Sequence, residues 1–224
     1  SERKIVVLSA MSGTTNALVC IAGCFYRKAP DEANKMICEQ EQKYAREIEA
    51  LYRTDLYKER ALQLVTEHFN HVWSFSGKPF TVFDEKVILA QGELISTGMM
   101  DLYLQEQGIE SVLLPALNFM RITADGEPDP VYIREKLVAL LDQHPDTSVF
   151  ITQGFICRNA YGDIDNLQRG GSDYSASLIG AAVDAEEIQI WTDIDGMHNN
   201  DPRFVNDTAP VRQLNFDEAA KLAH

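Results

Sequence analysis

Residues 148–175 read SVFITQGFICRNAYGDIDNLQRGGSDYS, and this stretch decides the fold class. Its first five residues, 148–152, predict a short strand of apolar and β-branched side chains. A loop containing glycine follows, and Ser172 with Asp173 then opens a helix that we expect to reach Asp184. A strand that leads through a polar loop into a helix is the repeating unit of parallel-sheet proteins.

The same alternation extends over the rest of the chain. Further strands are predicted at 4–9, 111–114 and 187–192, the first of them buried and parallel. Helices are predicted at 83–105, from Asp129-Pro130 onward, and from near Phe216. The helix at 83–105 is apolar nearly all round, so we expect it to be buried. The pattern indicates an α/β fold with a mainly parallel sheet covered on both faces.

A long charged segment interrupts this alternation. Residues from about 31 to 75 are predicted to be helical, with Asp31 as a possible N-cap and a break near Asp55. Such a segment is most simply a helical excursion whose outer faces are solvated. It interrupts a single domain that we expect to span residues 1–224.

Composition excludes some partners. The chain has 224 residues, 45% of them hydrophobic, and a formal net charge of −14. Nucleic acid and anionic membrane surfaces would repel such a chain, although a local cluster of cations could still hold an anionic ligand. The four cysteines lack zinc spacing, and we expect them to be reduced thiols. No signal peptide or membrane span is visible, so we expect a cytoplasmic protein.

Polar turns follow three of the predicted strands, after Leu8, after Thr152 and after Thr192. Because ligands of parallel sheets bind beyond the carboxyl ends of the strands, these turns are where chemistry is expected. After Thr152, the loop reaches Arg169, which could grip a carboxylate or phosphate, and Ser172-Asp173, where free helix N–H groups favour an anion. An ordinary capped helix beside a surface arginine is the competing interpretation.

Two further segments carry polar groups. The turn at 9–16 offers several hydroxyls beside Gly13, which suits an anionic substrate but equally suits a helix cap. Glu93 lies inside the apolar helix at 83–105, and a buried carboxylate needs a partner. A substrate ammonium would serve, and so would a structural arginine or lysine. The Asp-rich turn at 193–203 lacks the spacing of a calcium loop.

Taken together, these segments resemble the aspartate kinase catalytic domain of the amino-acid kinase family. They read VVLSAMSGTTN at 6–16, GELIST at 92–97, QGFI at 153–156, RGGSDY at 169–174, WTDIDG at 191–196 and DPR at 201–203. The resemblance implies a three-layer αβα sandwich, the amino-acid kinase fold. It also implies transfer of the γ-phosphoryl group of ATP, with Mg²⁺, to the β-carboxylate of L-aspartate. This reaction is the first step of lysine, threonine and methionine biosynthesis.

The resemblance assigns a role to residues that match the family's motifs. The implied aspartate contacts are Ser9, Thr15, Glu93, Phe155, Arg169, Ser172 and Asp173. Among these, Glu93 would pair with the substrate ammonium, Arg169 would hold the α-carboxylate, and Asp173 would organise the phosphate surroundings without acting as a base. We therefore expect Glu93 and Arg169 to lie close together. The implied nucleotide contacts are Thr192, Asp193 and Arg203, and a metal ligand cannot be named.

The sequence also departs from the family pattern. The opening Lys-Phe-Gly-Gly-Thr-Ser strand, a later lysine that contacts the nucleotide and the C-terminal ACT domains have no counterpart, so we expect the chain to be an incomplete domain. His198, Asn199 and Asn200 replace a tyrosine and threonines at the nucleotide edge. Two other interpretations stay open: a kinase for another acidic amino acid, such as glutamate or N-acetylglutamate, and a folded fragment without activity. When full length, the protein is expected to be a homodimer.

Overall fold

The computed structural model describes residues 3–167, 171–192, 196, 198–200, 204–205, 207–215 and 218. The chain divides into two compact units, residues 1–188 and residues 189–224. The first unit holds all the named helices and strands.

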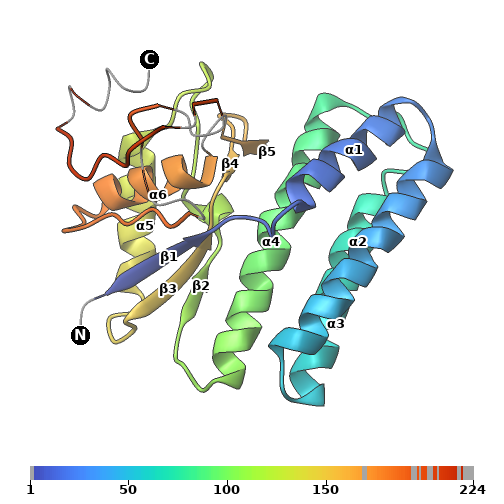
Figure 1. Cartoon of the computed structure of the whole chain (residues 1–224), viewed down its shortest axis with the longest axis horizontal. Helices are drawn as coiled ribbons and strands as arrows, with labels where there is room; N and C mark the ends of the chain where they lie inside the picture. The colour runs from blue at the N-terminus through green and yellow to red at the C-terminus, as the bar shows by residue number, and fades with distance from the viewer. Residues whose placement is uncertain are drawn as a thin grey trace. The chain divides into compact units, whose positions relative to one another are not determined.

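A parallel sheet forms the centre of the first unit (Figure 1). Its described strands are β1 (Lys4–Leu8), β3 (Val149–Gln153) and β2 (Val112–Leu114), in the order β1-β3-β2. Leu8 stands opposite Gln153 in the register, so β1 and β3 end side by side at one edge. The parallel arrangement is confirmed. The expectation that the first strand is buried is wrong, because β1 lies at the edge of this sheet and Val6 is 40% exposed.

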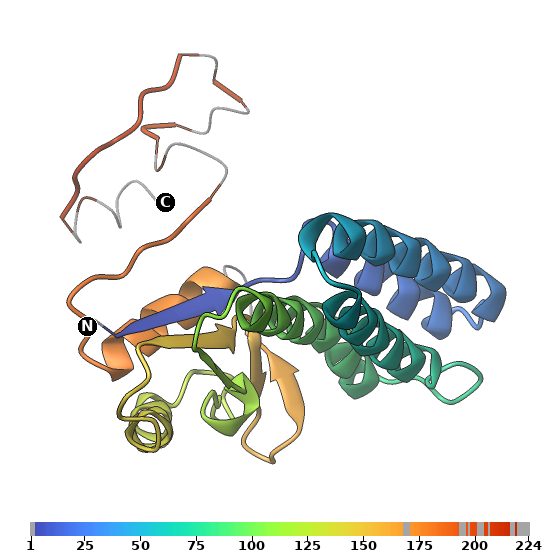
Figure 2. The ribbon, with the colours of Figure 1, turned by 90° about the horizontal axis from the view of Figure 1, so that it is seen from below.

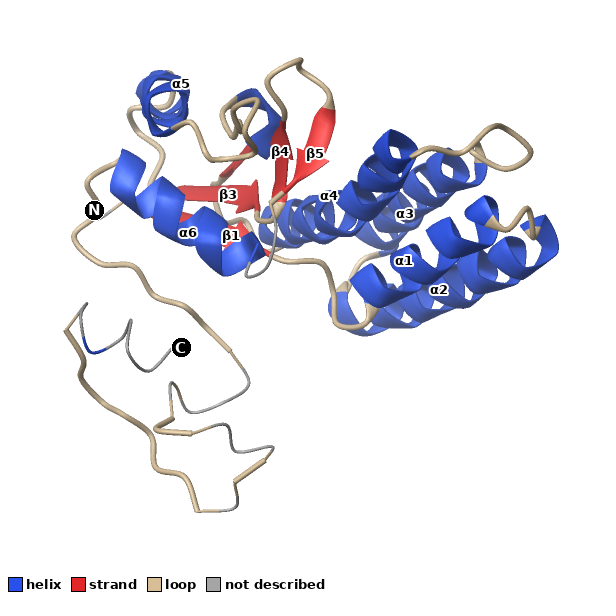
Figure 3. Cartoon of the chain, turned by 90° about the horizontal axis from the view of Figure 1, so that it is seen from above, coloured by secondary structure: helices blue, strands red, loops and turns tan. Residues whose placement is uncertain are grey.

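Helices cover both faces of this sheet (Figure 3). Helix α4 (Val82–Glu106) packs against all three strands, while α6 (Gly171–Ala182) packs on β1 and α5 (Pro130–Asp142) packs on α6. The 3-10 helix η1 (Ala116–Asn118) follows β2, and a small antiparallel pair, β4 (Ile156–Arg158) and β5 (Ile164–Asn166), lies beside α4. The three-layer α/β architecture expected from the sequence is present.

The helix starts follow from local capping chemistry. Thr81 and Asp84 form a reciprocal capping box at the start of α4, and Asp129 accepts a hydrogen bond from the Tyr132 N–H at the start of α5. These interactions satisfy N–H groups that have no partner inside the helix. Asp31, in contrast, is not the N-cap of its helix, because Ala29 takes that position and Pro30 begins the helix.

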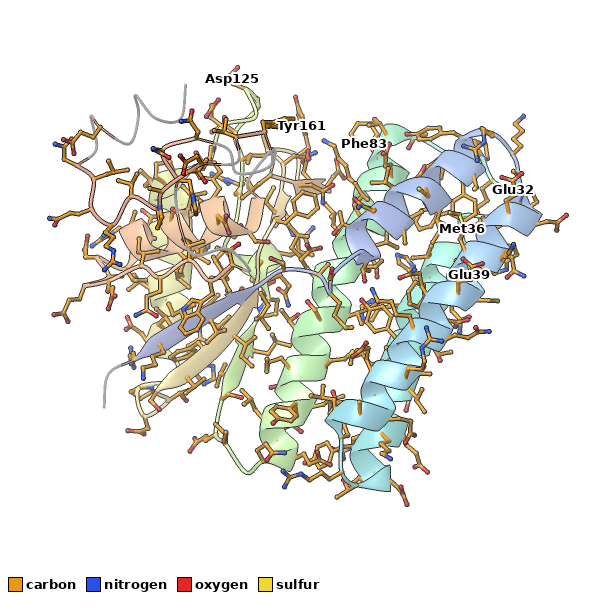
Figure 4. All side chains as sticks on the ribbon, in the orientation of Figure 1. Glu32, Met36, Glu39, Phe83, Asp125 and Tyr161 are labelled. Atoms are coloured by element: carbon orange, nitrogen blue, oxygen red, sulfur yellow. The ribbon has the colours of Figure 1, made fainter. Side chains whose placement is uncertain are left out.

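The charged segment folds as a bundle with α4 (Figure 2). Helices α1 (Thr14–Tyr26), α2 (Pro30–Leu51) and α3 (Asp55–Trp73) pack in succession, and both α1 and α3 pack on α4. The predicted break near Asp55 is the three-residue turn between α2 and α3. Solvated faces are also present: Glu32 and Glu39 are exposed on α2 (Figure 4).

Helix α4 contributes to two hydrophobic cores, which explains why its middle is mostly apolar. Ile88, Ile95 and Met99 join the core of the helical bundle. Ala90 joins the core beneath the sheet, and Leu94 packs against that core. Full burial of a large apolar side chain contributes about 1.5–3 kcal/mol, so both faces of α4 favour its central position.

Two predictions for the C-terminal region had different outcomes. The structure places residues 187–192 in no strand, although their β-branched and aromatic content suits one. A strand exists only when a neighbouring backbone pairs with it, and side-chain preference alone does not supply that neighbour. The helix expected from near Phe216 falls almost wholly outside the described residues. Over the described residues, no helix is long and apolar enough to cross a membrane.

Candidate active site

A cavity of about 290 Å³ opens where β1 and β3 end. It is lined by Ser9, Thr15, Glu93, Phe155, Gly171, Ser172 and Asp173. Six of the seven residues predicted to contact aspartate are therefore brought together from the turns that follow β1 and β3 and from helices α1, α4 and α6. The seventh, Arg169, lies outside the described residues, so its expected closeness to Glu93 stays a prediction. The volume is at the small end of the range for ligand sites and suits a compact metabolite.

Glu93 is the most deeply buried polar group of this cavity, with 3% of its surface exposed. Its Oε1 atom accepts a hydrogen bond of 3.2 Å from the Ala10 N–H. Its Oε2 atom is buried and has no hydrogen-bond partner among the described residues. Burial raises the pKa of Glu93 from its ordinary value of 4.5 to about 7, although the Ala10 hydrogen bond opposes this shift.

The surroundings of Glu93 bear on the choice between a structural cation and a ligand. Within the part of the chain that the structure describes, no arginine or lysine forms an ion pair with Glu93. Gly92 permits the close contact with the Ala10 turn, since a Cβ atom at that position would lie 2.8 Å from the Ala10 Cβ. Glu93 lines the small polar cavity, and its buried carboxylate therefore has one oxygen without a partner among the described residues.

Other hydrogen bonds fix the turn that follows β1. The Ser96 hydroxyl on α4 donates to the Ser9 carbonyl at 2.7 Å. The Thr14 and Tyr44 hydroxyls are hydrogen-bonded at 3.0 Å in a buried setting, and the Lys43 ammonium donates to the Ser12 carbonyl. Lys43 and Tyr44 belong to α2, so the helical excursion supports the wall of the cavity. Sequence reasoning missed these contacts, because nothing local links α2 to residues 9–14.

Phe155 enters the cavity from a strained backbone conformation. Its φ angle of 64° lies in the left-handed region, which costs a non-glycine residue about 1–3 kcal/mol. Its N–H donates to the Ser175 hydroxyl at 2.9 Å, and that hydroxyl donates to the Gly171 carbonyl at 2.7 Å. A Cβ atom on Gly171 would lie 2.5 Å from the Phe155 ring, so glycine makes room for this side chain.

The first turn of α6 closes the cavity opposite α4. Gly154, directly after β3, lets this turn approach, because a Cβ atom there would meet the Ser172 backbone at 2.8 Å. Ser172 and Asp173 lie in the first turn, where free N–H groups favour negative ligand atoms. Among the described residues, no group of three or more His, Cys, Asp or Glu could hold a metal ion unaided. Asp173 offers one exposed carboxylate, and Mg²⁺ can bind through one carboxylate together with substrate phosphates.

The residues predicted to contact a nucleotide lie in the second unit of the chain. Thr192 is exposed and belongs to no strand, while Asp193 and Arg203 lie outside the described residues. In the described part of this unit, His198 and Pro210 form an antiparallel bridge. The nucleotide contacts therefore stay predictions.

Comparison with known proteins identifies the family. The model of the amino acid kinase family matches residues 1–224. The chain is 38% identical over 138 residues to the bifunctional aspartokinase/homoserine dehydrogenase 2 of Escherichia coli K12, covering 61% of this chain and 17% of that protein. It is 30% identical over 226 residues to lysine-sensitive aspartokinase 3 of the same organism, covering 98% of this chain and 49% of that protein.

A solved structure gives the same result in three dimensions. E. coli aspartokinase III in complex with aspartate and ADP superimposes with a TM-score of 0.78 at 28% identity, covering 98% of this chain and 49% of that one. The chain thus spans half or less of the length of these relatives. With the family model matched from end to end, this chain belongs to the amino acid kinase family.

Proposed function

We propose that the native protein containing this chain is an aspartate kinase, which transfers the γ-phosphoryl group of ATP to the β-carboxylate of L-aspartate. The observation that carries the proposal is the buried carboxylate of Glu93, a residue that lines the polar cavity and whose Oε2 atom has no partner among the described residues. An ammonium group would supply the missing partner. The similarity to E. coli aspartokinase III, solved with aspartate and ADP, supports both substrates.

In this proposal the cavity residues recognise the two ends of a free amino acid. Glu93 binds the ammonium group and Arg169 binds the α-carboxylate in a bidentate fork. Hydroxyls of Ser9, Thr15 and Ser172 and the first turn of α6 complete a polar wall, and Phe155 adds an apolar one. A substrate with an acylated nitrogen lacks the ammonium and would leave Glu93 unpaired. The Glu93 geometry therefore favours a free amino acid over N-acetylglutamate.

The chemical step needs no general base. The β-carboxylate of aspartate is already ionised at neutral pH and can attack the γ-phosphorus directly. A bond then forms between the carboxylate oxygen and phosphorus, and the bond from phosphorus to the ADP oxygen breaks, which gives 4-phospho-L-aspartate and ADP. Since two anions must meet, the protein contributes by positioning them and by spreading negative charge.

Asp173 and the first turn of α6 are the groups proposed to face the phosphates. The helix N–H groups stabilise negative oxygen atoms, and the Asp173 carboxylate orients cationic groups or supports Mg²⁺. The ion, when bound, would neutralise charge that develops on the phosphate oxygens. Thr192, Asp193 and Arg203 are proposed to hold the nucleotide, on the strength of the motif resemblance.

The experiment is an assay of the native protein with ATP, MgCl₂ and L-aspartate, in which hydroxylamine traps the acyl phosphate as a hydroxamate. Glutamate and N-acetylglutamate serve as competing substrates in the same assay. We expect hydroxamate with aspartate alone. If no hydroxamate forms with aspartate, glutamate or N-acetylglutamate, the proposed function is refuted. A preference for glutamate would instead correct the substrate.

Arg169 gives a second test. Arg169→Ala should raise the aspartate KM and lower kcat/KM by about 100-fold or more, because a buried or half-buried carboxylate loses its bidentate partner. Arg134→Ala is the matched control, since Arg134 is an exposed arginine that pairs with Asp184 on the surface. An Arg169→Ala enzyme with kinetics like those of Arg134→Ala would remove Arg169 from the site.

The family resemblance also leads us to propose that the native protein is a homodimer. Light scattering after size-exclusion chromatography measures its mass directly. A monomer at micromolar concentration would contradict this part of the proposal.

A further inference from the structure

A buried network of hydrogen bonds connects η1 and the end of β3 to Glu93, which lines the cavity. The side chain of Gln153, the last residue of β3, is 2% exposed. Its Oε1 atom accepts the Ala116 N–H of η1 at 2.8 Å, and its Nε2 atom donates to the Thr97 hydroxyl of α4 at 2.8 Å. The Thr97 hydroxyl, in turn, donates to the Glu93 carbonyl at 2.7 Å.

The donors and acceptors of this network can be assigned. A backbone N–H can only donate and a carbonyl can only accept, so the Thr97 hydroxyl receives the Gln153 amide hydrogen and donates its own to a backbone carbonyl of α4. The Glu93 carbonyl, at 2.7 Å, is nearer than the Leu94 carbonyl, at 3.3 Å. Thr97 is fully buried, so these groups are shielded from bulk solvent. Such a network rigidifies the parts that it joins, because any displacement leaves a buried polar atom unsatisfied.

This network of hydrogen bonds ends at the backbone carbonyl of Glu93, the residue on which the proposed function depends. Gln153 is followed by Gly154, which hydrogen-bonds to the Leu8 carbonyl, and by Phe155, which bonds to Ser175 of α6. Three consecutive residues at the end of β3 therefore reach α4, β1 and α6, the three elements around the cavity. Gln153 is the one that reaches the Glu93 turn.

We propose that Gln153 and Thr97 are positioning residues, which hold the Glu93 turn of α4 at the end of β3 and so set the place of the Glu93 carboxylate in the cavity. This inference rests on the proposed function for its kinetic consequence. Neither residue lines the cavity. Their hydrogen bonds lead to Glu93, so we expect their effect on an amino-acid substrate to pass through that residue.

The test compares two threonines in the native protein. Thr97→Val keeps the shape but removes the hydroxyl that joins Gln153 to Glu93. Thr152→Val is the matched control, because Thr152 is also fully buried while its hydroxyl has no partner among the described residues. Thr97→Ser is the conservative variant that keeps the hydroxyl. Ile133→Val, in the core beneath the sheet, reproduces a modest loss of stability at a distance from the cavity.

We expect Thr97→Val and Gln153→Leu to raise the aspartate KM by about tenfold, because small misplacements of a binding group are costly, while the ATP KM changes by less than about twofold. Thr97→Ser should restore the aspartate KM, and Thr152→Val and Ile133→Val should keep it. An unchanged aspartate KM in Thr97→Val would overturn the inference. Equal increases in both KM values, shared by Ile133→Val, would do the same.

A second measurement does not depend on turnover. Carbon-13 NMR of the Glu93 carboxyl group follows its titration in the free protein. We expect the midpoint to fall in Thr97→Val and Gln153→Leu, since a displaced turn admits water, and to stay unchanged in Thr152→Val. An unmoved midpoint in both variants would refute the positioning role even if aspartate proved not to be the substrate. A protein that lacks aspartate kinase activity but shows the expected midpoint shift would refute only the proposed function.

Discussion

Glu93 and Asp165 are two buried carboxylates, one on helix α4 and the other beside it, and their surroundings differ. Asp165, in β5, is 6% exposed, and its Oδ1 atom lies 2.6 Å from the Lys86 ammonium of α4. It also accepts the Asn166 N–H at 2.7 Å. Glu93, two turns further along α4, is 3% exposed and receives one N–H from Ala10.

The comparison separates structural charge from charge held ready for a ligand. A buried carboxylate that serves the fold is paired by the fold, because an uncompensated charge in the interior is costly. Glu93 has no such ion pair among the described residues, and burial raises its pKa to about 7. Near neutral pH the free protein therefore contains both the protonated and the ionised form of Glu93. Perturbed carboxylates in cavities mark functional sites for this reason.

The largest expected effect comes from Glu93→Gln. This variant removes the proposed partner of the substrate ammonium and should lower kcat/KM for aspartate by at least about 30-fold, the equivalent of about 2 kcal/mol. The folded state should lose little stability, because the amide carries no charge to desolvate. Hydroxamate kinetics and thermal unfolding measure the two effects on one sample. A large loss of stability with normal kinetics would place Glu93 with Asp165, as a structural group.

Asp165→Asn should show the reverse behaviour. It leaves the half-buried Lys86 ammonium without its carboxylate and should lower the free energy of unfolding by about 2 kcal/mol, less than for a fully buried pair because Lys86 is 32% exposed. Urea denaturation measures the change. Asp163→Asn, an exposed carboxylate on the same hairpin, is the control. If Asp165→Asn raises the aspartate KM, Asp165 also affects substrate binding, and the distinction between a structural and a substrate-binding carboxylate is wrong.

The pH dependence of aspartate binding should show up to about a tenfold loss of affinity for each pH unit below 7. In that range the free protein holds a proton on Glu93, and the substrate ammonium must displace it. Burial raises the pKa of the neighbouring Tyr44 above its ordinary 10.0, so Tyr44 stays neutral throughout. Calorimetry from pH 5 to 8 measures the slope. Asp173→Asn should retain the slope and Glu93→Gln should abolish it.

The same equilibrium should appear in the stability of the unliganded protein. The folded pKa of Glu93, about 7, lies above its ordinary value of 4.5, so the folded state binds the proton more tightly. The contribution of Glu93 to stability is therefore full below pH 4.5 and is lost as the pH rises through 7. Unfolding curves for wild type and Glu93→Gln should diverge over that interval, and parallel curves would contradict the assignment.

The smallest effect is expected from the double variant Asp165→Asn with Lys86→Met. Removing both partners leaves no unpaired charge, so its free energy of unfolding should return to within about 1 kcal/mol of wild type. The two single variants complete a double-mutant cycle. A double variant that is less stable than Asp165→Asn would show that Lys86 contributes more than charge compensation.

Much of the fold could be predicted because its signals are local. Asp129-Pro130 indicates a helix start, and the mostly apolar sequence between Val87 and Leu104 indicates that α4 is largely buried. Residues 187–192 show where such reasoning fails, since their composition suits a strand and the structure contains none there. Burial of β1 was also mispredicted, because the order of strands decides which one lies at an edge.

The candidate site divides in the same way. Glu93 attracts attention in the sequence because it is a charge within an apolar helix, and Ser172 because it begins a helix after glycines. Gln153 and Lys43 carry no such local signal. Their importance depends on contacts with Thr97 and Ser12, which lie far away along the chain.

The α/β class, the resemblance to the family, the helix start at Asp129-Pro130 and the residue types that follow the strands could be read from the amino-acid order alone. Those properties depend on side-chain periodicity and on groups within one helical turn of each other. The folded structure was needed to show that Lys86 compensates Asp165, whereas the Oε2 atom of Glu93 has no partner among the described residues. The physical reason is that the energy of a buried charge depends on which distant groups the folded chain brings within hydrogen-bonding distance.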